Sequence, residues 1–449
     1  LVIIGAGPGG YSTALRAAEL SMKVALVERD ATVGGTCLNR GCIPSKALIT
    51  ATHTIDTVHR AAELGVNASV NGIDFGTLRD YRLRVVKTMV GGLAGLLAHR
   101  GITVFRANAT MDLTATNIVI ATGAKPRPLP GNPFAGALID STQALEVNEF
   151  PSSAVIIGAG AIALEFASMW NAAGSKVTLL IRKDRVLSAW DRRAGTTLTR
   201  ELKRHGVNII TRASVTHVDT GANLGATVHY TREGQDGEQS VWGEIALVAI
   251  GRDPITDPAW GVTIDDHGHV ATDAYGRTDK PGVWAVGDVT AGHALAHRAF
   301  EQGIVIAETI AGLNPKPVDE ATVPQIVFSF PEAASVGLTV EQAQAREDLI
   351  EIKETNYPML ANARMLMSGT AGSLTIVSGC DAANPDTPRV LGVHMVSQMA
   401  SDIIAEAEQL VGNHMPLADA ARLVHPHPTF SETLGEALLK ADGRPLHTR

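Results

Sequence analysis

Two of the three cysteines in this 449-residue chain lie five positions apart, within GGTCLNRGCIPSK at residues 34–46. They are Cys37 and Cys42, which follow a glycine-rich turn and begin a stretch that can continue as a helix to Ile49. Unpaired N–H groups at a helix start favour negative charge, so a thiolate there has a lowered pKa and a raised reactivity. We therefore interpret Cys37 and Cys42 as a redox pair.

Lys46 strengthens this interpretation. It follows Cys42 by four positions, so on a helix its ammonium group lies on the same face as the sulfur and adds positive charge there. The alternative is two buried structural thiols. A zinc site would need a second cysteine pair or suitably spaced histidines, so we expect no metal site. The third cysteine, Cys380, is interpreted as a structural thiol in a hairpin.

The composition is that of a globular chain, with 45% hydrophobic and 4% aromatic residues, and the length predicts about three domains. The formal net charge of −8 indicates neither nucleic acid nor an anionic membrane as partner. No apolar run approaches the roughly 20 residues that span a bilayer, and the few cysteines fit a cytoplasmic protein. Because Leu1 already lies in an apparent strand and is not methionine, we expect residues to precede it.

The elements around the cysteines begin with a nucleotide-binding pattern. An apolar strand at residues 1–4 runs into a glycine motif, a helix to about Leu20 and a second strand at residues 24–27, which ends at Glu28. Such glycines let the backbone approach a pyrophosphate at the helix N-terminus, and the acid accepts hydrogen bonds from a ribose. The residues predicted to bind in this way are Gly5, Gly7, Gly10 and Glu28.

The pattern repeats later, with a strand at residues 154–157, the glycine motif at residues 158–163 and a strand at residues 177–180. Two such units imply two dinucleotides, and a flavin beside a nicotinamide is the usual pairing for hydride transfer. The 23 positions from Gly5 to Glu28, counted from Gly158, reach Ile181, so the ribose-binding acid is absent. Arg182, Lys183 and Arg185 follow, which favours a 2'-phosphate and therefore NADPH. The alternative is a solvated basic turn in an NAD enzyme.

The cysteine stretch resembles the redox signature of the flavoprotein pyridine nucleotide-disulfide oxidoreductases, most closely that of dihydrolipoamide dehydrogenases. This resemblance implies an α/β fold, with two Rossmann-like domains that bind FAD and NAD(P) and a C-terminal α+β dimerisation domain. The expected boundaries are 1–145 and 256–318 for the two parts of the FAD-binding domain, 146–255 for the NAD(P)-binding domain and 319–449 for the interface domain. A homodimer is implied as well.

Further motifs match this family. The ATG at residues 121–123 resembles the point where the chain leaves the flavin domain, and the GRDP at residues 251–254 resembles the end of the NAD(P) domain. Ala163 and the run IRKDRVL are similar to NADPH-linked glutathione reductases. The segment Met111 to Thr114 is shorter than the usual family excursion, which indicates a trimmed loop or missing residues. The resemblance implies further FAD contacts at Gly35, Thr36, Lys46, Ala121, Thr122, Gly123 and Asp288, and NAD(P) contacts at Gly158, Gly160, Ala163, Arg182, Lys183, Gly251 and Arg252.

After about Glu320 the pattern changes to short β-like runs and a helix at about 401–411, as in the family's interface domain. The segment ends in HPHPTFSE at residues 425–432, which is similar to the HxHPTxSE ending of dihydrolipoamide dehydrogenases. The resemblance implies that His427 is the acid/base for the dithiol, that Glu432 orients it, and that both act on the disulfide of the other subunit. An imidazole suits this task because it exchanges a proton near neutrality.

The sequence therefore predicts an FAD-dependent disulfide oxidoreductase. By family precedent Cys42 lies nearer the flavin, Cys37 exchanges with substrate, and Lys46 pairs with Glu165 beside the flavin. The expected partner is a small dithiol or disulfide or a lipoyl carrier domain. One alternative is an NADPH-dependent reductase of a low-molecular-weight disulfide. Two others, an NAD(P)H:quinone or dye reductase and a structural subunit of a 2-oxo acid dehydrogenase complex, do not need the cysteines and His427 together.

Overall fold

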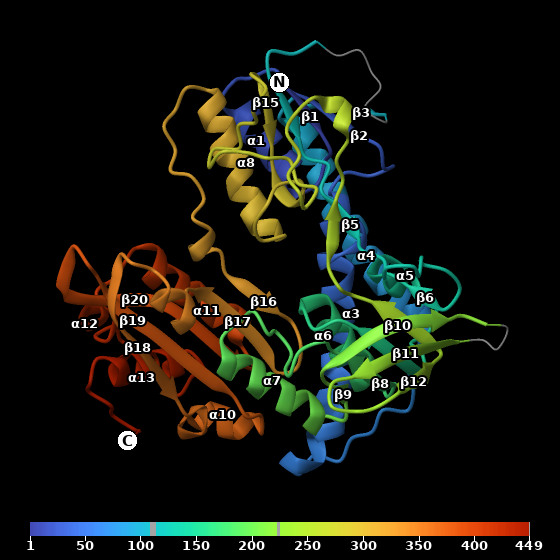
Figure 1. Ribbon diagram of the computed structural model, residues 1–449, viewed down its shortest axis with the longest axis vertical. Helices are drawn as coiled ribbons and strands as arrows, with labels where there is room; N and C mark the ends of the chain where they lie inside the picture. Colours follow the sequence, from blue (N-terminus) through green and yellow to red (C-terminus); the bar gives the residue numbers. More distant parts are fainter. Residues whose placement is uncertain (108–113, 222–224, 449) are drawn as a thin grey trace.

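The computed structural model describes residues 1–107, 114–221 and 225–448 (Figure 1). Residues 111–113, which belong to the unusually short segment, lie outside the described residues. The described chain contains two parallel five-stranded sheets with flanking helices and an antiparallel five-stranded sheet near the C-terminus. The predicted α/β fold class with an α+β C-terminal part is confirmed.

The first parallel sheet has the order β15-β4-β1-β2-β3. Its apolar strands are buried because helices cover them, as Ile3, Leu26 and Val119 show with no exposed surface. The chain returns to this sheet after the second unit, because β15 pairs with β4. The strands are β1 (Val2–Ile4), β2 (Ala25–Glu28), β3 (Thr103–Arg106), β4 (Ile118–Ile120) and β15 (Val283–Ala285), and α1 (Pro8–Glu19) packs beside α8 (Ala296–Ile310).

The second parallel sheet has the order β6-β13-β7-β8-β9 and repeats the strand–glycine–helix pattern of the first. A three-stranded antiparallel meander, β10-β11-β12, packs against it. The strands of the sheet are β6 (Leu138–Ile139), β7 (Ser153–Ile157), β8 (Lys176–Leu180), β9 (Asn208–Ile210) and β13 (Ile245–Val248). The helices are α5 (Ser141–Glu146), α6 (Ala161–Ala172) and α7 (Arg192–Arg204), and the meander consists of β10 (Ala213–Asp219), β11 (Ala226–Arg232) and β12 (Glu238–Gly243).

Two features connect the parallel sheets. An antiparallel pair, β5 (Ala124–Pro126) with β14 (Arg252–Pro254), links the chain segments that leave the two units. The helices that follow the first glycine motif extend toward the second unit (Figure 1), where Leu48 and Ile49 join the same buried core as α6. These helices are α2 (Gly35–Arg40), α3 (Cys42–Arg60) and α4 (Phe75–His99), and the 3₁₀ turn η1 (Ala61–Leu64) follows α3. Two further 3₁₀ turns, η2 (Pro258–Trp260) and η3 (Gly287–Val289), lie on either side of β15 in the chain.

The C-terminal sheet is antiparallel, with the order β16-β17-β20-β19-β18. Cys380 is fully buried at the end of β19, within the hairpin to β20, as predicted. No described helix is long and apolar enough to cross a membrane. The strands are β16 (Gln325–Val327), β17 (Glu332–Gly337), β18 (Leu349–Tyr357), β19 (Ser373–Asp381) and β20 (Asn384–Ser397). The helices are η4 (Glu320–Thr322), α9 (Val340–Gln344), η5 (Met359–Ala361), α10 (Ala363–Ser368), α11 (Ala400–Gly412), α12 (Leu417–Ala420) and α13 (Glu432–Ala441).

Candidate active site

The two clustered cysteines lie on either side of a helix break. Cys37 belongs to α2, Cys42 is the first residue of α3, and Gly41 joins the helices. A Cβ atom at Gly41 would lie 2.9 Å from the carbonyl oxygen of Thr36, so glycine permits this tight junction. The junction places the two free thiols beside each other, so that each changes the pKa of the other. The predicted helix start at the cysteine stretch is therefore confirmed for Cys42.

The two thiols titrate differently. The pKa of Cys42 is lowered to about 7, chiefly by the hydrogen bond with Cys37 and further by the Lys46 ammonium, although desolvation opposes this. The pKa of Cys37 is raised because of the same hydrogen bond, desolvation and the negative charge of Cys42. The pair therefore begins to lose its first proton near neutrality, and the negative charge is favoured on Cys42.

The ammonium group beside Cys42 is held by an ion pair. Lys46 Nζ lies 2.7 Å from Oε2 of Glu165 on α6, and 4.6 Å from the ring centroid of Phe328. The other carboxylate oxygen, Oε1, accepts a hydrogen bond of 3.2 Å from the backbone N–H of Phe328. Glu165 is buried, and these two contacts satisfy both of its carboxylate oxygens, as a buried carboxylate requires. The predicted pairing of Lys46 with Glu165 is present in the structure.

The first glycine motif forms a tight turn between β1 and α1. Gly5 has φ +106°, and a Cβ atom there would lie 2.3 Å from the carbonyl oxygen of Ala121. Gly35, at the start of α2, packs on the same turn, since its Cβ would lie 2.6 Å from the Cα of Gly7. Glu28 ends β2 and accepts a hydrogen bond of 2.8 Å from the backbone N–H of Ala6. Glu28 and the start of α2 thus both contact the glycine turn.

Asp288 and Arg252 lie next to each other, 4.0 Å apart between Oδ2 and Nε. Desolvation raises the pKa of Asp288 despite the nearby guanidinium, and it lowers the pKa of Arg252. Arg252 was assigned to NAD(P) from its motif, but the structure places it beside the predicted flavin ligand. Thr122 Oγ1 donates a 2.7 Å hydrogen bond to the carbonyl of Ile255, so the ATG segment contacts the residue that follows the GRDP motif.

The second glycine motif repeats the geometry of the first. Gly158 has φ +141°, and its Cβ would lie 2.2 Å from the carbonyl oxygen of Ala249, whereas a Cβ at Gly160 would meet no atom within 4 Å. Ala163 is fully buried in α6. These neighbours require glycine at 158 for the turn, and they leave room beside Gly160 for a ligand to approach.

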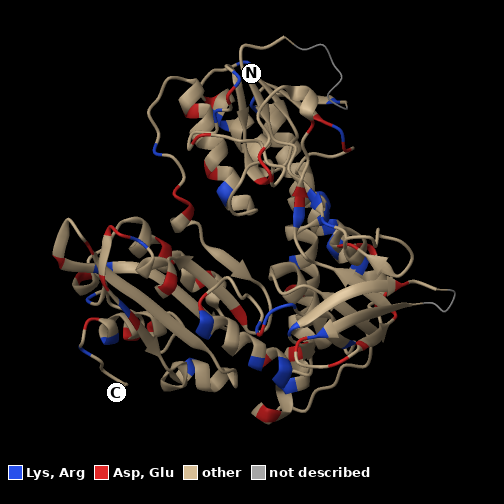
Figure 2. Cartoon of the chain, in the orientation of Figure 1, with Lys and Arg blue, Asp and Glu red and all other residues tan. Residues whose placement is uncertain are grey.

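The turn after β8 carries the basic residues. Ile181 is fully buried, whereas Arg182 and Lys183 are exposed and have no ion-pair partner among the described residues. Arg185 instead contacts Asp184 at 3.2 Å. An adjoining hollow of about 370 Å³ continues the basic surface onto α7, which carries basic residues at both ends (Figure 2). Its cationic lining residues are Arg185, Arg192, Arg200 and Lys203.

His427 and Glu432 form a contact of their own. His427 Nδ1 lies 2.6 Å from Glu432 Oε1, and the His427 side chain is 72% exposed. Burial alone would raise the pKa of Glu432, but hydrogen bonds from His427 and from the backbone of Thr429 lower it. Asn362 Nδ2 donates to the second oxygen of Glu432 at 3.3 Å. The carboxylate therefore orients the ring, and Nε2 is left as the edge that can exchange a proton with substrate.

The predicted residues fall into separate groups within one subunit. Cys37, Cys42, Lys46 and Glu165 meet at the α2–α3 junction. His427 and Glu432 instead pair at the turn before α13, and no hydrogen bond or ion pair of the described residues joins them to these four. Sequence reasoning missed the contact of Phe328 with Lys46 and Glu165. It also missed Asn362, which holds Glu432. No local signal marks either residue, because each acts through a contact with a distant part of the chain.

Known proteins match this chain over nearly its whole length. Residues 1–303 match the family model described as pyridine nucleotide-disulphide oxidoreductase, and residues 323–438 match the dimerisation domain of that family. The dihydrolipoyl dehydrogenase of Geobacillus stearothermophilus is 35% identical, over 99% of this chain and 97% of its own length. That of Thermus scotoductus is 36% identical, over 100% and 98%.

Solved structures agree with this result. The LpdA protein of Mycobacterium tuberculosis superposes with a TM-score of 0.86 at 25% identity, over 98% of this chain and 99% of that one. The HOCl-induced flavoprotein disulfide reductase RclA of Escherichia coli gives a TM-score of 0.83 at 27% identity, over 97% and 98%.

Proposed function

Because the chain belongs to the pyridine nucleotide-disulphide oxidoreductase family, we propose that Cys37 and Cys42 exchange electrons between a dithiol or disulfide substrate and its cofactors. The enzyme is a flavoprotein of the dihydrolipoyl dehydrogenase type that uses FAD and NAD(P), as predicted. The observation that carries the proposal is the thiol pair at the α2–α3 junction, in which the pKa of Cys42 is lowered to about 7.

The residues of the first unit fit a bound FAD. Gly7, the residue before α1, provides no side-chain cap, so the first N–H groups of α1 are free to bind a pyrophosphate. Glu28 lies at the end of β2 for a ribose, and Asp288 follows β15 as a half-buried carboxyl group suited to a ribityl hydroxyl. When bound, FAD supplies the two-electron carrier between the thiol pair and the nicotinamide.

Disulfide exchange follows from the unequal thiols. In the direction of dithiol oxidation, a substrate thiolate attacks the sulfur of Cys37 in the Cys37–Cys42 disulfide. The substrate–Cys37 bond forms, and Cys42 leaves as a thiolate. A leaving thiol with a pKa of about 7 departs more easily than an ordinary cysteine. The second substrate thiolate then attacks the substrate sulfur bound to Cys37, so the substrate disulfide forms, the bond to Cys37 breaks and Cys37 takes up a proton. Two electrons have then passed from the substrate to the cysteine pair.

A base must deprotonate the substrate thiols, and His427 is suited to this role because Glu432 orients its ring. The dimerisation domain supports a homodimer. We propose that His427 of the partner subunit faces Cys37, because no hydrogen bond or ion pair of the described residues joins His427 or Glu432 to the cysteines of the same subunit. The active site is then shared between subunits.

Three finer points belong to the same proposal. The exposed pair Arg182 and Lys183, together with the missing acid at Ile181, supports a preference for NADPH. The few cysteines support a cytoplasmic location, which cell fractionation would test. Both the relatives' names and the histidine ending support dihydrolipoamide, free or on a lipoyl carrier domain, as the substrate.

Steady-state kinetics of the holoenzyme test the substrate. Dihydrolipoamide is supplied with NAD or NADP in one direction, and a panel of small disulfides is supplied with NADH or NADPH in the other. We expect turnover of dihydrolipoamide that is lost in Cys37→Ser. Faster turnover of a small disulfide would favour the low-molecular-weight disulfide reductase, and quinone or dye reduction that survives Cys37→Ser as the main activity would overturn the proposal.

A further inference from the structure

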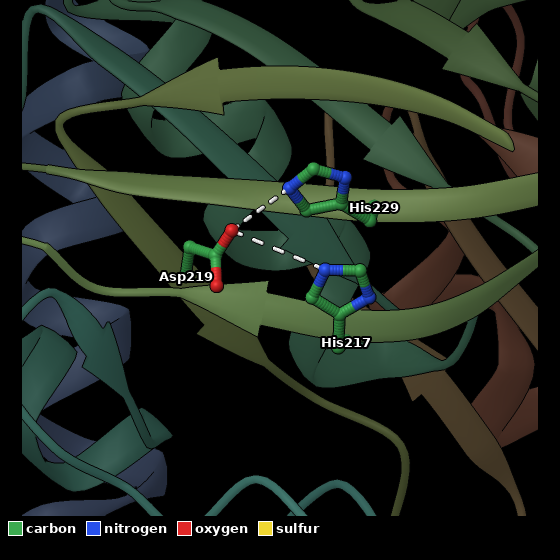
Figure 3. Close-up of side chains that lie close together, drawn as sticks. All are labelled: His217, Asp219 and His229. Carbon is green, nitrogen blue, oxygen red and sulfur yellow. Dashed lines mark hydrogen bonds and ion pairs between the residues drawn. The ribbon is translucent and has the colours of Figure 1, made fainter.

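Two histidines face each other on the β10–β12 meander, outside the redox site. His217 on β10 is paired directly with His229 on β11, and Asp219 lies two residues beyond His217 on the same strand (Figure 3). Alternate residues of the strands point inward, where Val228 and Tyr230 are buried in the core. The histidines and the aspartate therefore lie together on the opposite, outer face of the meander.

The two rings present the same edge to one carboxylate oxygen. Their centroids are 4.1 Å apart and their planes differ by 8°. Oδ2 of Asp219 lies 3.1 Å from Nε2 of His229 and 3.9 Å from Nε2 of His217, as the dashed lines in Figure 3 indicate. One potential ligand atom from each of the three residues lies within 4.8 Å of the others. Two imidazole nitrogens and a carboxylate oxygen thus lie on one side of the cluster, within reach of a single ion.

The other edge of each ring is also oriented. Glu238 on β12 lies 3.7 Å from Nδ1 of His217 and 3.6 Å from Nδ1 of His229. Thr216 Oγ1 donates a 2.7 Å hydrogen bond to Glu238 Oε1 and lies 3.3 Å from Nδ1 of His217. A metal-binding imidazole usually donates its far N–H to a carboxylate, and Glu238 lies just beyond hydrogen-bond distance of both Nδ1 atoms.

We propose that His217, Asp219 and His229 form a binding site for a first-row transition-metal dication, for which Zn²⁺ is the probe. Ligands at about 2.0–2.2 Å from zinc, at tetrahedral angles, are about 3.3–3.5 Å apart, which is close to the observed separations. The two stacked rings would turn about their side-chain bonds on binding, so that both Nε2 atoms point at the ion. Neutral imidazoles and a carboxylate suit Zn²⁺ better than Mg²⁺ or Ca²⁺, which prefer oxygen ligands only. Water would complete the coordination, because Asp219 is 65% exposed.

The proposal is independent of the disulfide chemistry, so the experiment separates the two. Oxidised holoenzyme without an affinity tag is titrated with ZnCl₂ by calorimetry, and the Cys37–Cys42 disulfide keeps the redox thiols from binding zinc. We expect one Zn²⁺ per subunit, and we expect His217→Ala, His229→Ala and Asp219→Asn each to weaken binding at least about tenfold. Glu238→Gln should have a smaller effect, because it only orients the rings.

The matched control is His447→Ala, because His447 is also exposed and contacts a single carboxylate, Glu436, at 2.9 Å. It should bind zinc as the unchanged protein does. Retained FAD absorbance and an unchanged circular dichroism spectrum establish that each variant is folded. If one is not, the conservative variants His217→Gln and His229→Gln replace it. An affinity for zinc that is unchanged in His217→Ala and His229→Ala, or absent in the unchanged protein, would overturn the metal site and leave an ion-pair cluster.

Discussion

The Lys46 ammonium lowers the pKa of Cys42 and therefore favours the Cys42 thiolate. Only the hydrogen bond from Cys37 lowers that pKa more. In Lys46→Met this attraction is lost, so we expect that pKa to rise by about one unit. The thiolate is present above its pKa and is lost as the pH falls through it. A pH titration of the long-wavelength absorbance of the two-electron-reduced enzyme should therefore have its midpoint near 7, and higher in Lys46→Met.

Two further variants serve as controls for that titration. Cys42→Ser should lack the long-wavelength absorbance altogether, and Lys23→Met, which removes an exposed lysine elsewhere in the first unit, should leave the midpoint unchanged. An unchanged midpoint in Lys46→Met would mean that the hydrogen bond from Cys37 alone sets the pKa of Cys42.

A second residue-scale prediction concerns the basic turn. In the double variant Arg182→Ala/Lys183→Ala, we expect KM for NADPH to rise about tenfold and KM for NADH to change little, because charge-assisted contacts to a 2'-phosphate are lost. Steady-state kinetics with both nucleotides measures this difference. Lys176→Ala is the control, since Lys176 is an exposed cation at the other end of β8. A higher kcat/KM for NADH than for NADPH in the unchanged enzyme would contradict the proposed preference.

At the scale of elements, the turn between β7 and α6 depends on a glycine without room for a side chain. Gly158→Ala would combine an unfavourable φ with a carbonyl oxygen 2.2 Å from the new Cβ, so we expect about 3 kcal/mol of destabilisation or weak nucleotide binding. Gly174→Ala is the matched control, because Gly174 has φ +97° but no atom within 4 Å of the Cβ, and about 1 kcal/mol is expected.

Thermal denaturation and KM for the nicotinamide nucleotide measure both glycine variants. Equal destabilisation of the two variants would mean that the positive φ alone causes it, and that the close approach of Ala249 to the turn makes no contribution. A selective loss in Gly158→Ala would instead identify the backbone contact as the reason that the turn tolerates only glycine.

At the scale of the whole molecule, the shared active site predicts complementation between inactive subunits. A heterodimer of Cys37→Ser and His427→Ala subunits contains one complete site if Cys37 and His427 come from different subunits. Refolding or coexpression of the two in equal amounts should therefore restore about a quarter of the normal activity, since half of the dimers are mixed and each has one of two sites. Sites formed within single subunits would give no recovery above the two separate variants.

The sequence by itself determined the parts of the protein whose signals are local. Spacing identified the cysteine pair, and each glycine motif between an apolar strand and a helix predicted its unit, because a tight turn constrains neighbouring residues only. The predicted fold, enzyme class and cofactor pair are confirmed on this basis. The roles of single site residues stay predictions.

Only the tertiary structure decided which distant residues meet. Glu165 reaches Lys46 across 119 positions, and Phe328 joins them from the start of the C-terminal domain. Arg252 lies beside Asp288, and the register of β10 with β11 aligns His217 with His229. Such contacts depend on strand order and on the packing of whole sheets, which the residues at either end of the contact do not encode locally.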